Sequence, residues 1–464
     1  MSEFCYSRIP DLGAFLLILH RMEVIEQVMF VFVLCIGIAI FTKRVQFIRR
    51  NIFLGRKLDL SNNPLARWKQ LVFVALGQSK MVLRPIAGFF HILIYAGFVL
   101  INIEVLEILI DGLLGTHRFF EPYLGSLYNW AIGFFEILAA GVIVACLVFL
   151  GRRFITQLPR LNMPELKGWP TIDATVILVV EILLMLALLN MNAVEQVLVH
   201  KHVPGFDAHC SFPVSQFFVG FFQGLEPSTL KLLERLFWWS HFVGIIIFLN
   251  YVPYSKHWHI IMSFPNVYYT PLKPRGEFAN LEYVTTEVKL MMDPSAQPPV
   301  GYEPPAGFGA KDVQDLSWKN LMDAYSCTEC GRCSSVCPAT LTGKLLSPRK
   351  VMMDTRDRLE EMGEGLDRSI KSGGSLLEKF TDGKDLHSYI SAEELWACTT
   401  CNACVDACPI NINPLDIIVQ MRQYQVMEKS AAPGGLNNMF GNIENNGAPW
   451  QFNQMDKANW TINE

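Results

Sequence analysis

The chain has 464 residues, of which 51% are hydrophobic, and it carries a formal net charge of −4 at pH 7. Its mean hydropathy of +0.27 is high for a wholly soluble protein, and its length allows about three domains. No Lys/Arg-rich block with interleaved aromatic residues occurs, so nucleic acid is not expected as a partner.

Five apolar runs, all before residue 253, are long enough to cross a bilayer, which takes about 20 helical residues. None of them carries Lys or Arg at its centre. The predicted spans are Val24–Thr42, Pro85–Ile110, Trp130–Leu150, Ile172–Met191 and Leu236–Val252. A shorter apolar stretch at 12–19 has no small-residue cleavage site behind it, so a removable signal peptide is not expected.

A sixth apolar stretch, Phe212–Leu225 (FPVSQFFVGFFQGL), is rich in phenylalanine but too short to span easily. We predict an interfacial or re-entrant helix there. A sixth span would make the count even and would move the rest of the chain to the opposite side of the membrane.

The basic residues predict the orientation of the spans, because short loops rich in Lys and Arg stay on the cytoplasmic side. The loops after the first and third spans are rich in Lys and Arg, and the two opposite loops are sparser. We therefore expect a multi-pass protein of the bacterial inner (cytoplasmic) membrane with its N-terminus outside. Lys256 and everything after it would lie in the cytoplasm, where reducing conditions keep thiolates available as ligands.

Four histidines are candidate ligands of a haem b, which needs two imidazoles from facing helices. His91 lies on the second span and His241 on the last, with His257 and His259 just beyond Pro253. The two spans run in opposite directions, so His91 and either His257 or His259 fall at the same depth. At about 100° per residue, His241 and His259 share a helix face, whereas His241 and His257 lie about 160° apart. We predict one haem between His91 and His259, with His257 as the alternative ligand. The other interpretation is that each is an ordinary histidine at the membrane interface.

The stretch PYSKHWHIIMSFPN (Pro253–Asn266) resembles the end of the last helix in a known family of membrane cytochromes. That family is the five-helix di-haem cytochrome b subunit of respiratory nitrate reductase, also used by membrane subunits of heterodisulfide reductase and dissimilatory sulfite reductase complexes. The resemblance implies that His259 binds the cytoplasmic-side haem and His241 the outer one. The family has a second histidine on span two, ten residues after the first, where this chain has Ile101; a second haem therefore stays open.

Eight of the twelve cysteines form two copies of the pattern C-x2-C-x2-C-x3-C-P. In this pattern three cysteines bind one [4Fe–4S] cluster and the fourth binds the other cluster. Structural zinc and disulfides are the alternatives, but neither requires this spacing or the following proline. The predicted ligands of the first cluster are Cys327, Cys330, Cys333 and Cys408, and those of the second are Cys398, Cys401, Cys404 and Cys337.

The predicted fold is all-α: a five-helix transmembrane bundle followed by a cytoplasmic α-helical ferredoxin domain with two [4Fe–4S] clusters. Ser347-Pro348 is typical of a helix start, and we expect helices there, to about Gly363, and at Pro414–Lys429. The stretch CTECGRCSSVCPATLTGKLLSPRKVMMDTRD resembles the helical ferredoxin module of heterodisulfide reductase and of the iron–sulfur subunits of fumarate reductase and succinate dehydrogenase. The expected domains are 1–262 (cytochrome b-like), 263–316 (Pro-rich linker), 317–430 (ferredoxin) and 431–464 (tail).

The tail contains the stretch ENNGAPWQFNQMDKANW (Glu444–Trp460), which is similar to a segment that precedes two cysteine-rich CCG domains in proteins fused like this one. The sequence ends at Glu464 without those domains. We expect a docking segment for a separate polypeptide that carries them. A disordered Asn/Gly-rich end is the alternative.

No nucleophile–base pair, phosphate-binding glycine loop or flavin signature is present. We therefore expect a membrane-anchored electron-transfer subunit, with its enzyme status uncertain: a quinone-linked oxidoreductase subunit whose partner carries the substrate site. It would exchange electrons between the membrane quinone pool and a cytoplasmic redox protein such as a CCG-domain subunit, a dehydrogenase or an electron-transferring flavoprotein. The alternative is a haemless membrane anchor that presents a ferredoxin module to a larger redox assembly.

Quinone chemistry also needs protons, and carboxylates inside spans are candidate carriers. Each of them could instead be a helix–helix hydrogen-bond partner. The candidates are Glu104 and Glu107 on the second span, Glu136 on the third and Glu181 on the fourth.

Overall fold

The computed structural model describes residues 12–206, 212–274, 277–278, 280–303, 307–374, 381–451, 453–456 and 458–462. These residues form helices and no β-strand, with one isolated bridge between Arg56 and Ser317, which confirms the all-α prediction. The fold divides into two compact units. Within the described residues, unit 1 comprises the chain up to Ile48 and Gly77–Ile260, and unit 2 comprises Arg49–Leu76 and the chain from Ile261 onward.

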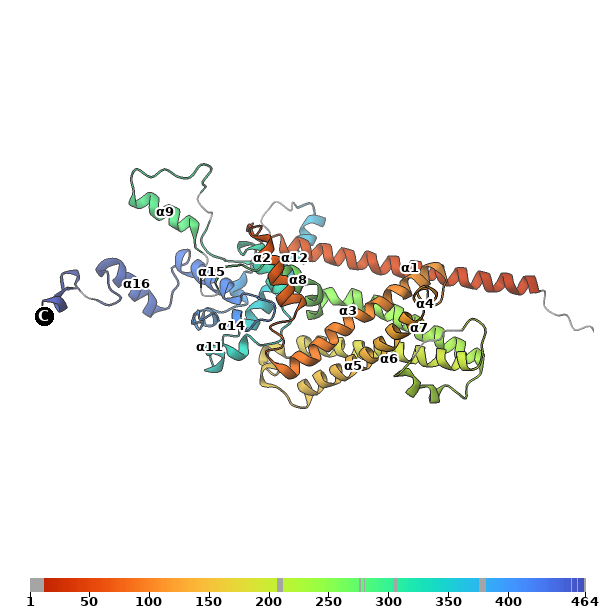
Figure 1. The fold of residues 1–464 in the computed structure, drawn as a ribbon. Coiled ribbons are helices and arrows are strands. Elements are labelled where there is room, and N and C mark those ends of the chain that lie inside the picture. Colours follow the sequence, from red (N-terminus) through yellow and green to blue (C-terminus); the bar gives the residue numbers. More distant parts are fainter. Residues whose placement is uncertain are drawn as a thin grey trace, which may run out of the picture. The chain divides into compact units, whose positions relative to one another are not determined.

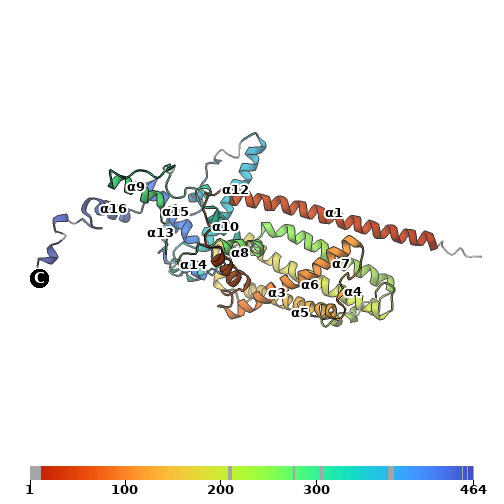
Figure 2. The same cartoon turned by 45° about the horizontal axis from the view of Figure 1, so that its top comes forward.

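Unit 1 is built on long apolar helices. Figures 1 and 2 show four of them, α3, α5, α6 and α7, packed side by side. The helices are α1 (Leu12–Ile52, which ends inside unit 2), α3 (Pro85–Leu114), the short α4 (Glu121–Leu124), α5 (Ser126–Phe154), α6 (Trp169–His200) and α7 (Pro227–Tyr251). Among the described residues, five stretches are long and apolar enough to cross a membrane: Val24–Ile52, Pro85–Leu114, Ser126–Phe154, Trp169–His200 and Pro227–Tyr254. Each of the five predicted spans coincides with one of these long apolar helices, and each helix is longer than predicted at one or both ends.

Small residues bring these helices close together, as is usual where lipid supplies no hydrophobic driving force between helices. A Cβ on Gly97 of α3 would lie 2.6 Å from Val142 Cγ2 of α5, and one on Gly244 of α7 would lie 2.8 Å from Leu184 Cδ2 of α6. A larger residue at either glycine would force the facing Val142 or Leu184 side chain to move.

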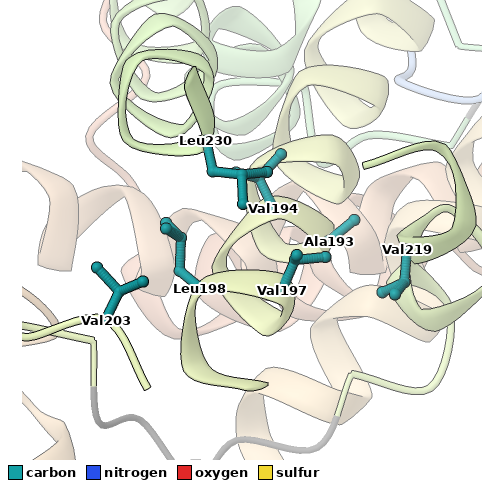
Figure 3. Close-up of a cluster of buried hydrophobic side chains, with 7 residues drawn as sticks. All are labelled: Ala193, Val194, Val197, Leu198, Val203, Val219 and Leu230. Carbon is teal, nitrogen blue, oxygen red and sulfur yellow. The ribbon is translucent and has the colours of Figure 1, made fainter. Parts of the chain in front are cut away.

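The stretch 212–225 does not form the predicted interfacial or re-entrant helix. It makes two short 3₁₀ turns, η4 (Ser215–Phe217) and η5 (Val219–Phe221). Two contacts hold it: the Glu136 carboxylate accepts hydrogen bonds from the backbone N–H groups at 214 and 215, and Val219 is buried in a hydrophobic cluster at the end of α6. Figure 3 shows this cluster, which consists of Ala193, Val194, Val197, Leu198, Val203, Val219 and Leu230.

Unit 2 is a set of shorter helices. They are α2 (Pro64–Gln70), η1 (Leu71–Leu76), α8 (His259–Tyr268, which begins in unit 1), α9 (Glu282–Met292), α10 (Trp318–Ser326), α11 (Pro338–Leu341), α12 (Pro348–Lys371), α13 (Ala392–Trp396), α14 (Ala403–Ala407), α15 (Pro414–Met427) and α16 (Gly434–Asn446). The predicted helices after Ser347 and at 414–429 are confirmed. The hydroxyl of Ser347 caps α12 by accepting from the Lys350 N–H, and α12 continues beyond the expected end at Gly363.

The segment Arg49–Leu76 packs into unit 2 although the stretch Gly77–Ile260 of unit 1 separates it from the rest of that unit in the sequence. The fully buried Asn51 donates from Nδ2 to the Tyr325 hydroxyl at 3.1 Å, and the Arg56 N–H donates to the Leu316 carbonyl at 2.7 Å. Arg67 is 1% exposed and donates to two backbone carbonyls in and just after α8. Much of the basic loop that follows the first span is therefore a structural part of unit 2.

Candidate metal centres

The two cysteine runs share one backbone conformation. In the first run Glu329 and Gly331 have φ values of 54° and 70°, and in the second run Thr400 and Asn402 have φ values of 54° and 59°. These left-handed residues occupy equivalent positions, immediately before and after the second cysteine of each run. Glycine and asparagine adopt this conformation most readily, so the residue after the second cysteine suits the turn in both copies.

The first cysteine set is Cys327, Cys330, Cys333 and Cys408, and all four line one cavity in unit 2 that Cys404 also lines. Burial raises the pKa of the Cys327 thiol to about 12, and the neighbouring Cys330 and Cys408 add to the rise. Burial likewise raises the pKa of Cys333 well above its usual value, and the neighbouring Cys327, Cys330, Cys408 and Cys404 add to the rise. Four thiolates at this position therefore need a nearby positive charge, which bound iron would supply.

The second cysteine set is Cys398, Cys401, Cys404 and Cys337. Burial raises the pKa of Cys404 to about 12, and the neighbouring Cys398 and Cys337 contribute to the rise. Burial also raises the pKa of Cys398, and Cys337 and Cys401 are again among its neighbours. Cys408 is thus a neighbour of Cys327 and Cys333, and Cys337 is a neighbour of Cys398 and Cys404.

The donor chemistry of both sets fits iron–sulfur ligation. No disulfide joins any of the eight cysteines, all of which lie in the described part of the chain. In that same part, no three His, Cys, Asp or Glu side chains lie close enough to bind one metal ion. A [4Fe–4S] cluster instead takes one thiolate on each of four irons, so the thiols of a set need only surround it.

Positive side chains and backbone N–H groups accompany both sets. Arg349 and Arg332 line the cavity of the first set and are 0% and 6% exposed. In the second set, the half-buried Arg422 donates to the Cys398 carbonyl at 2.6 Å. Two sulfurs also accept backbone hydrogen bonds: Cys408 Sγ at 3.3 Å from the N–H of residue 412, and Cys398 Sγ at 3.4 Å from the N–H of residue 400. Donors of this kind stabilise the negative charge of thiolate-bound clusters.

Three of the four predicted histidines come together in unit 1, and we call them the histidine group. The ring centroids of His91 and His259 are 6.5 Å apart, and those of His257 and His259 are 5.6 Å apart. The Nδ1 of His259 lies 3.0 Å from the Lys256 carbonyl, so a proton on Nδ1 leaves the lone pair on Nε2 available to a metal. Burial lowers the pKa of His259, and it lowers the pKa of His257 to about 3, so both imidazoles are neutral.

His91 and His259 come from different helices, α3 and α8, and would be the two imidazoles that hold a haem iron. The rings of His257 and His259 are nearly perpendicular, at 80°, and the two residues are close in sequence, so His257 would be a neighbour of this pair. His257 Nε2 lies 3.7 Å from Glu181 Oε1, so that carboxylate borders the histidine group.

His241 is placed elsewhere in unit 1. It is 2% exposed, and its Nδ1 lies 2.9 Å from the Leu184 carbonyl of α6. None of the ring contacts in the described residues joins His241 to the histidine group, and Ile101, where the resemblance implies a partner for it, is a buried aliphatic residue.

Two of the four predicted carboxylates are hydrogen-bond acceptors between elements. Glu107 accepts from the Tyr128 hydroxyl at 2.6 Å, and Glu136 accepts from Asn192 Nδ2 at 3.0 Å. Sequence reasoning missed the cation beside them, Arg118, which is 5% exposed. A single arginine in a short loop between two spans gave no pattern that could have identified this role.

Comparison with known proteins supports the iron–sulfur interpretation. Residues 326–412 match the family model described as a 4Fe-4S dicluster domain. The chain therefore contains a dicluster domain of the [4Fe–4S] type, and this domain lies inside unit 2.

Several relatives are similar over most or part of the chain. The probable iron-sulfur-binding oxidoreductase FadF of Bacillus subtilis is 27% identical over 94% of this chain and 60% of its own length. An EtfAB:quinone oxidoreductase of Syntrophomonas wolfei is 26% identical over 86% of this chain and 54% of its own length. A probable membrane-anchored ferredoxin of Chromohalobacter salexigens is 32% identical over 38% of this chain and 26% of its own length. Heterodisulfide reductase subunits of Methanosarcina species match 24% to 32% of this chain.

The chain thus spans little more than half the length of the first two relatives. No solved structure matches it. The family match and the five apolar helices together indicate a membrane protein that carries an iron–sulfur dicluster domain.

Proposed function

We propose that this chain is the membrane-anchored subunit that passes electrons between a cytoplasmic redox protein and the quinone pool, through two [4Fe–4S] clusters and one haem b. The observation that carries the proposal is that the fourth cysteine of each run lies beside leading cysteines of the other run: Cys408 is near Cys327 and Cys333, and Cys337 is near Cys398 and Cys404. The same chain has five membrane-length helices and the histidine group.

When bound, the clusters and the haem supply one-electron carriers, which a quinone needs because it exchanges its two electrons singly with such centres. The first and second cysteine sets would hold the clusters. His91 and His259 would hold the haem, with the Lys256 carbonyl fixing the tautomer of His259.

The side chains around the cysteine sets adjust the charge balance of the sites. Arg349 and Arg332 place two cations at the wall of the first cavity, and Arg422 places one beside Cys398. Their role is electrostatic, because each added electron is a negative charge in a partly buried place.

The partner and the orientation complete the proposal. One relative is named an EtfAB:quinone oxidoreductase, which supports an electron-transferring flavoprotein as the soluble partner; a dehydrogenase or a CCG-domain subunit is the other class. We propose that Glu444–Trp460 docks such a subunit, and that the basic loops keep the cysteine sets in the cytoplasm of a bacterium, with the N-terminus outside. We also propose that unit 1 has the five-helix arrangement of the cytochrome b subunit of nitrate reductase, with one haem. His241 would lie outside the site of that haem.

An optical spectrum of the purified, dithionite-reduced protein tests the haem. We expect a haem b α-band in the wild type and its loss in His91→Ala, with iron–sulfur absorption retained. His202→Ala is the matched control, because this histidine is exposed and lies outside the histidine group, and its spectrum should be unchanged. Broad iron–sulfur absorption alone in the wild type would contradict the haem and support a haemless anchor.

A further inference from the structure

A network of buried polar side chains lies at the end of unit 1 where α3 and α6 finish and α5 begins, and we call it the Arg118 network. The guanidinium of Arg118 donates from Nε to Glu195 Oε1 at 2.8 Å and from Nη2 to Glu195 Oε2 at 2.5 Å. It also donates to Asn192 Oδ1 at 3.0 Å and to the Tyr128 hydroxyl at 3.1 Å. One cation thus links the loop after α3 with α5 and α6.

Most carboxylates of the network have fixed structural partners. Asp111 accepts from the Thr116 hydroxyl at 2.6 Å and from the Arg118 N–H at 2.9 Å. Glu107 accepts from the Tyr128 hydroxyl at 2.6 Å and from the backbone N–H of residue 120 at 2.9 Å. Because donors occupy these oxygens, a proton on Asp111 or Glu107 would break contacts that hold the loop.

Glu136 and Glu195 are fixed in the same way. Glu136 accepts from Asn192 Nδ2 at 3.0 Å, from the Ser215 N–H at 3.1 Å and from the hydroxyl of Ser215. Glu195 accepts two hydrogen bonds from Arg118 and lies 3.2 Å from His117 Nε2.

Glu104 differs from these four carboxylates. It is 5% exposed, and its Oε1 has no hydrogen-bond partner among the described residues. It lies one helical turn before Glu107 on α3, within electrostatic reach of Arg118 and of the carboxylates of Glu107, Glu136 and Glu195. Glu104 is therefore the carboxyl of this network that can gain or lose a proton without breaking a structural hydrogen bond.

The network also has a connection to the surface. The side chain of His117 is 33% exposed, whereas that of its partner Glu195 is 1% exposed. An imidazole can pass a proton between two hydrogen-bonded neighbours through its two ring nitrogens. His117 therefore joins solvent to the Arg118–Glu195 pair, which is an electrostatic neighbour of Glu104.

We propose that Glu104 is the proton-exchange site for a lipid-soluble quinone, with the Arg118–Glu195 pair as its electrostatic neighbour and His117 at the solvent side of that pair. This inference rests on the proposed function. In quinol oxidation two electrons leave, one at a time, to the chain's one-electron carriers. Each quinol O–H bond breaks as an O–H bond forms on the Glu104 carboxylate, and that proton is then released to water. Quinone reduction runs the same steps in reverse.

Labelling with dicyclohexylcarbodiimide tests Glu104 without any need for quinone turnover. This apolar reagent modifies protonated carboxyl groups in apolar surroundings. We expect peptide mapping of the holoprotein in membranes to find the adduct on Glu104 and not on Glu107 or Glu136. The adduct should disappear in Glu104→Gln and persist in Glu226→Gln, an exposed control at the start of α7. An adduct on Glu107 or Glu136 in place of Glu104, or an unmodified Glu104, would overturn the proposal.

The rate of quinone turnover is the second measurement that tests Glu104. We expect Glu104→Gln to lower quinone turnover by about 100-fold, the usual contribution of a positioned proton-transfer group, and Glu104→Asp to recover part of it. The iron–sulfur and haem spectra should be unchanged in both variants. Wild-type turnover in Glu104→Gln would contradict this role for Glu104 alone, whereas a wild type with no quinone turnover would contradict the proposed function itself.

Discussion

The two cysteine sets of unit 2 share a backbone conformation but differ in their surroundings. The first set has no exposed member, and two buried arginines, Arg332 and Arg349, line its cavity. In the second set Cys401 is exposed, and the accompanying cation, Arg422, is only half-buried. Buried cations favour the reduced, more negative form of a cluster. We therefore expect the second cluster to meet the soluble partner and the first to have the higher reduction potential.

The largest expected effect comes from replacing the fourth cysteine of each run, which is the predicted ligand of the other run's cluster. Cys408→Ser should remove the first cluster and keep the second, and Cys337→Ser should do the reverse. The non-haem iron content should fall by about half in each variant, because two [4Fe–4S] clusters together hold eight irons. Iron analysis with electron paramagnetic resonance would measure both effects.

Cys35→Ser is the matched control for these variants. Cys35 is an exposed cysteine of α1 outside both cysteine sets, so iron content should not change. If Cys408→Ser instead removed the cluster of its own run, the crossed grouping would be wrong.

A smaller effect is expected from the fully buried Arg349. Arg349→Gln should lower the reduction potential of the first cluster by about 60 mV, the one-electron equivalent of about 1.4 kcal/mol. The second cluster should keep its potential, and Arg349→Lys, which retains the charge, should shift the first much less. A redox titration followed by electron paramagnetic resonance measures both clusters in one sample. Equal shifts in the two clusters would contradict a local effect.

Arg422 should have the same influence on the second cluster, but a weaker one. Its guanidinium stacks on the Trp396 ring, 4.9 Å from the ring centroid, and solvent screens part of its charge. We expect Arg422→Gln to lower the potential of the second cluster by about 30 mV, half the effect at Arg349. The same titration tests this, and a larger shift than in Arg349→Gln would reverse the order of the two sites.

The smallest expected difference is in the rate at which oxygen damages the two clusters. Oxidative damage follows exposure, so the second cluster, with the exposed Cys401, should decay a few-fold faster than the first. The decay of the two spectra in oxygenated buffer at constant pH would show it. Faster loss of the first cluster would mean that ligand exposure does not govern access.

Features that depend on local sequence could be predicted well. The five spans follow from unbroken apolar runs, and the helix start at Ser347-Pro348 follows from capping chemistry. The two cysteine runs carry their own spacing rule, and residues 326–412 match the dicluster model that this rule implies.

Features that depend on distant contacts could not be predicted. The stretch 212–225 lacks the expected helix because it is held by Glu136, which lies 79 residues before Ser215. The ion pair of Arg118 and Glu195 joins residues 77 positions apart. The lengths of the membrane helices were also underestimated. Helices continue past the apolar core of a bilayer, whereas the run of apolar residues that predicts them ends there.

The place of Arg49–Leu76 has a consequence for how the protein is made. Unit 2 is formed from two segments of the chain, and all of α3, α5, α6 and α7 is translated between them. On the ribosome, the early piece must wait for its partners until those four helices have emerged. Membrane insertion therefore comes before completion of unit 2, and iron loading is expected on a protein already held at the bilayer.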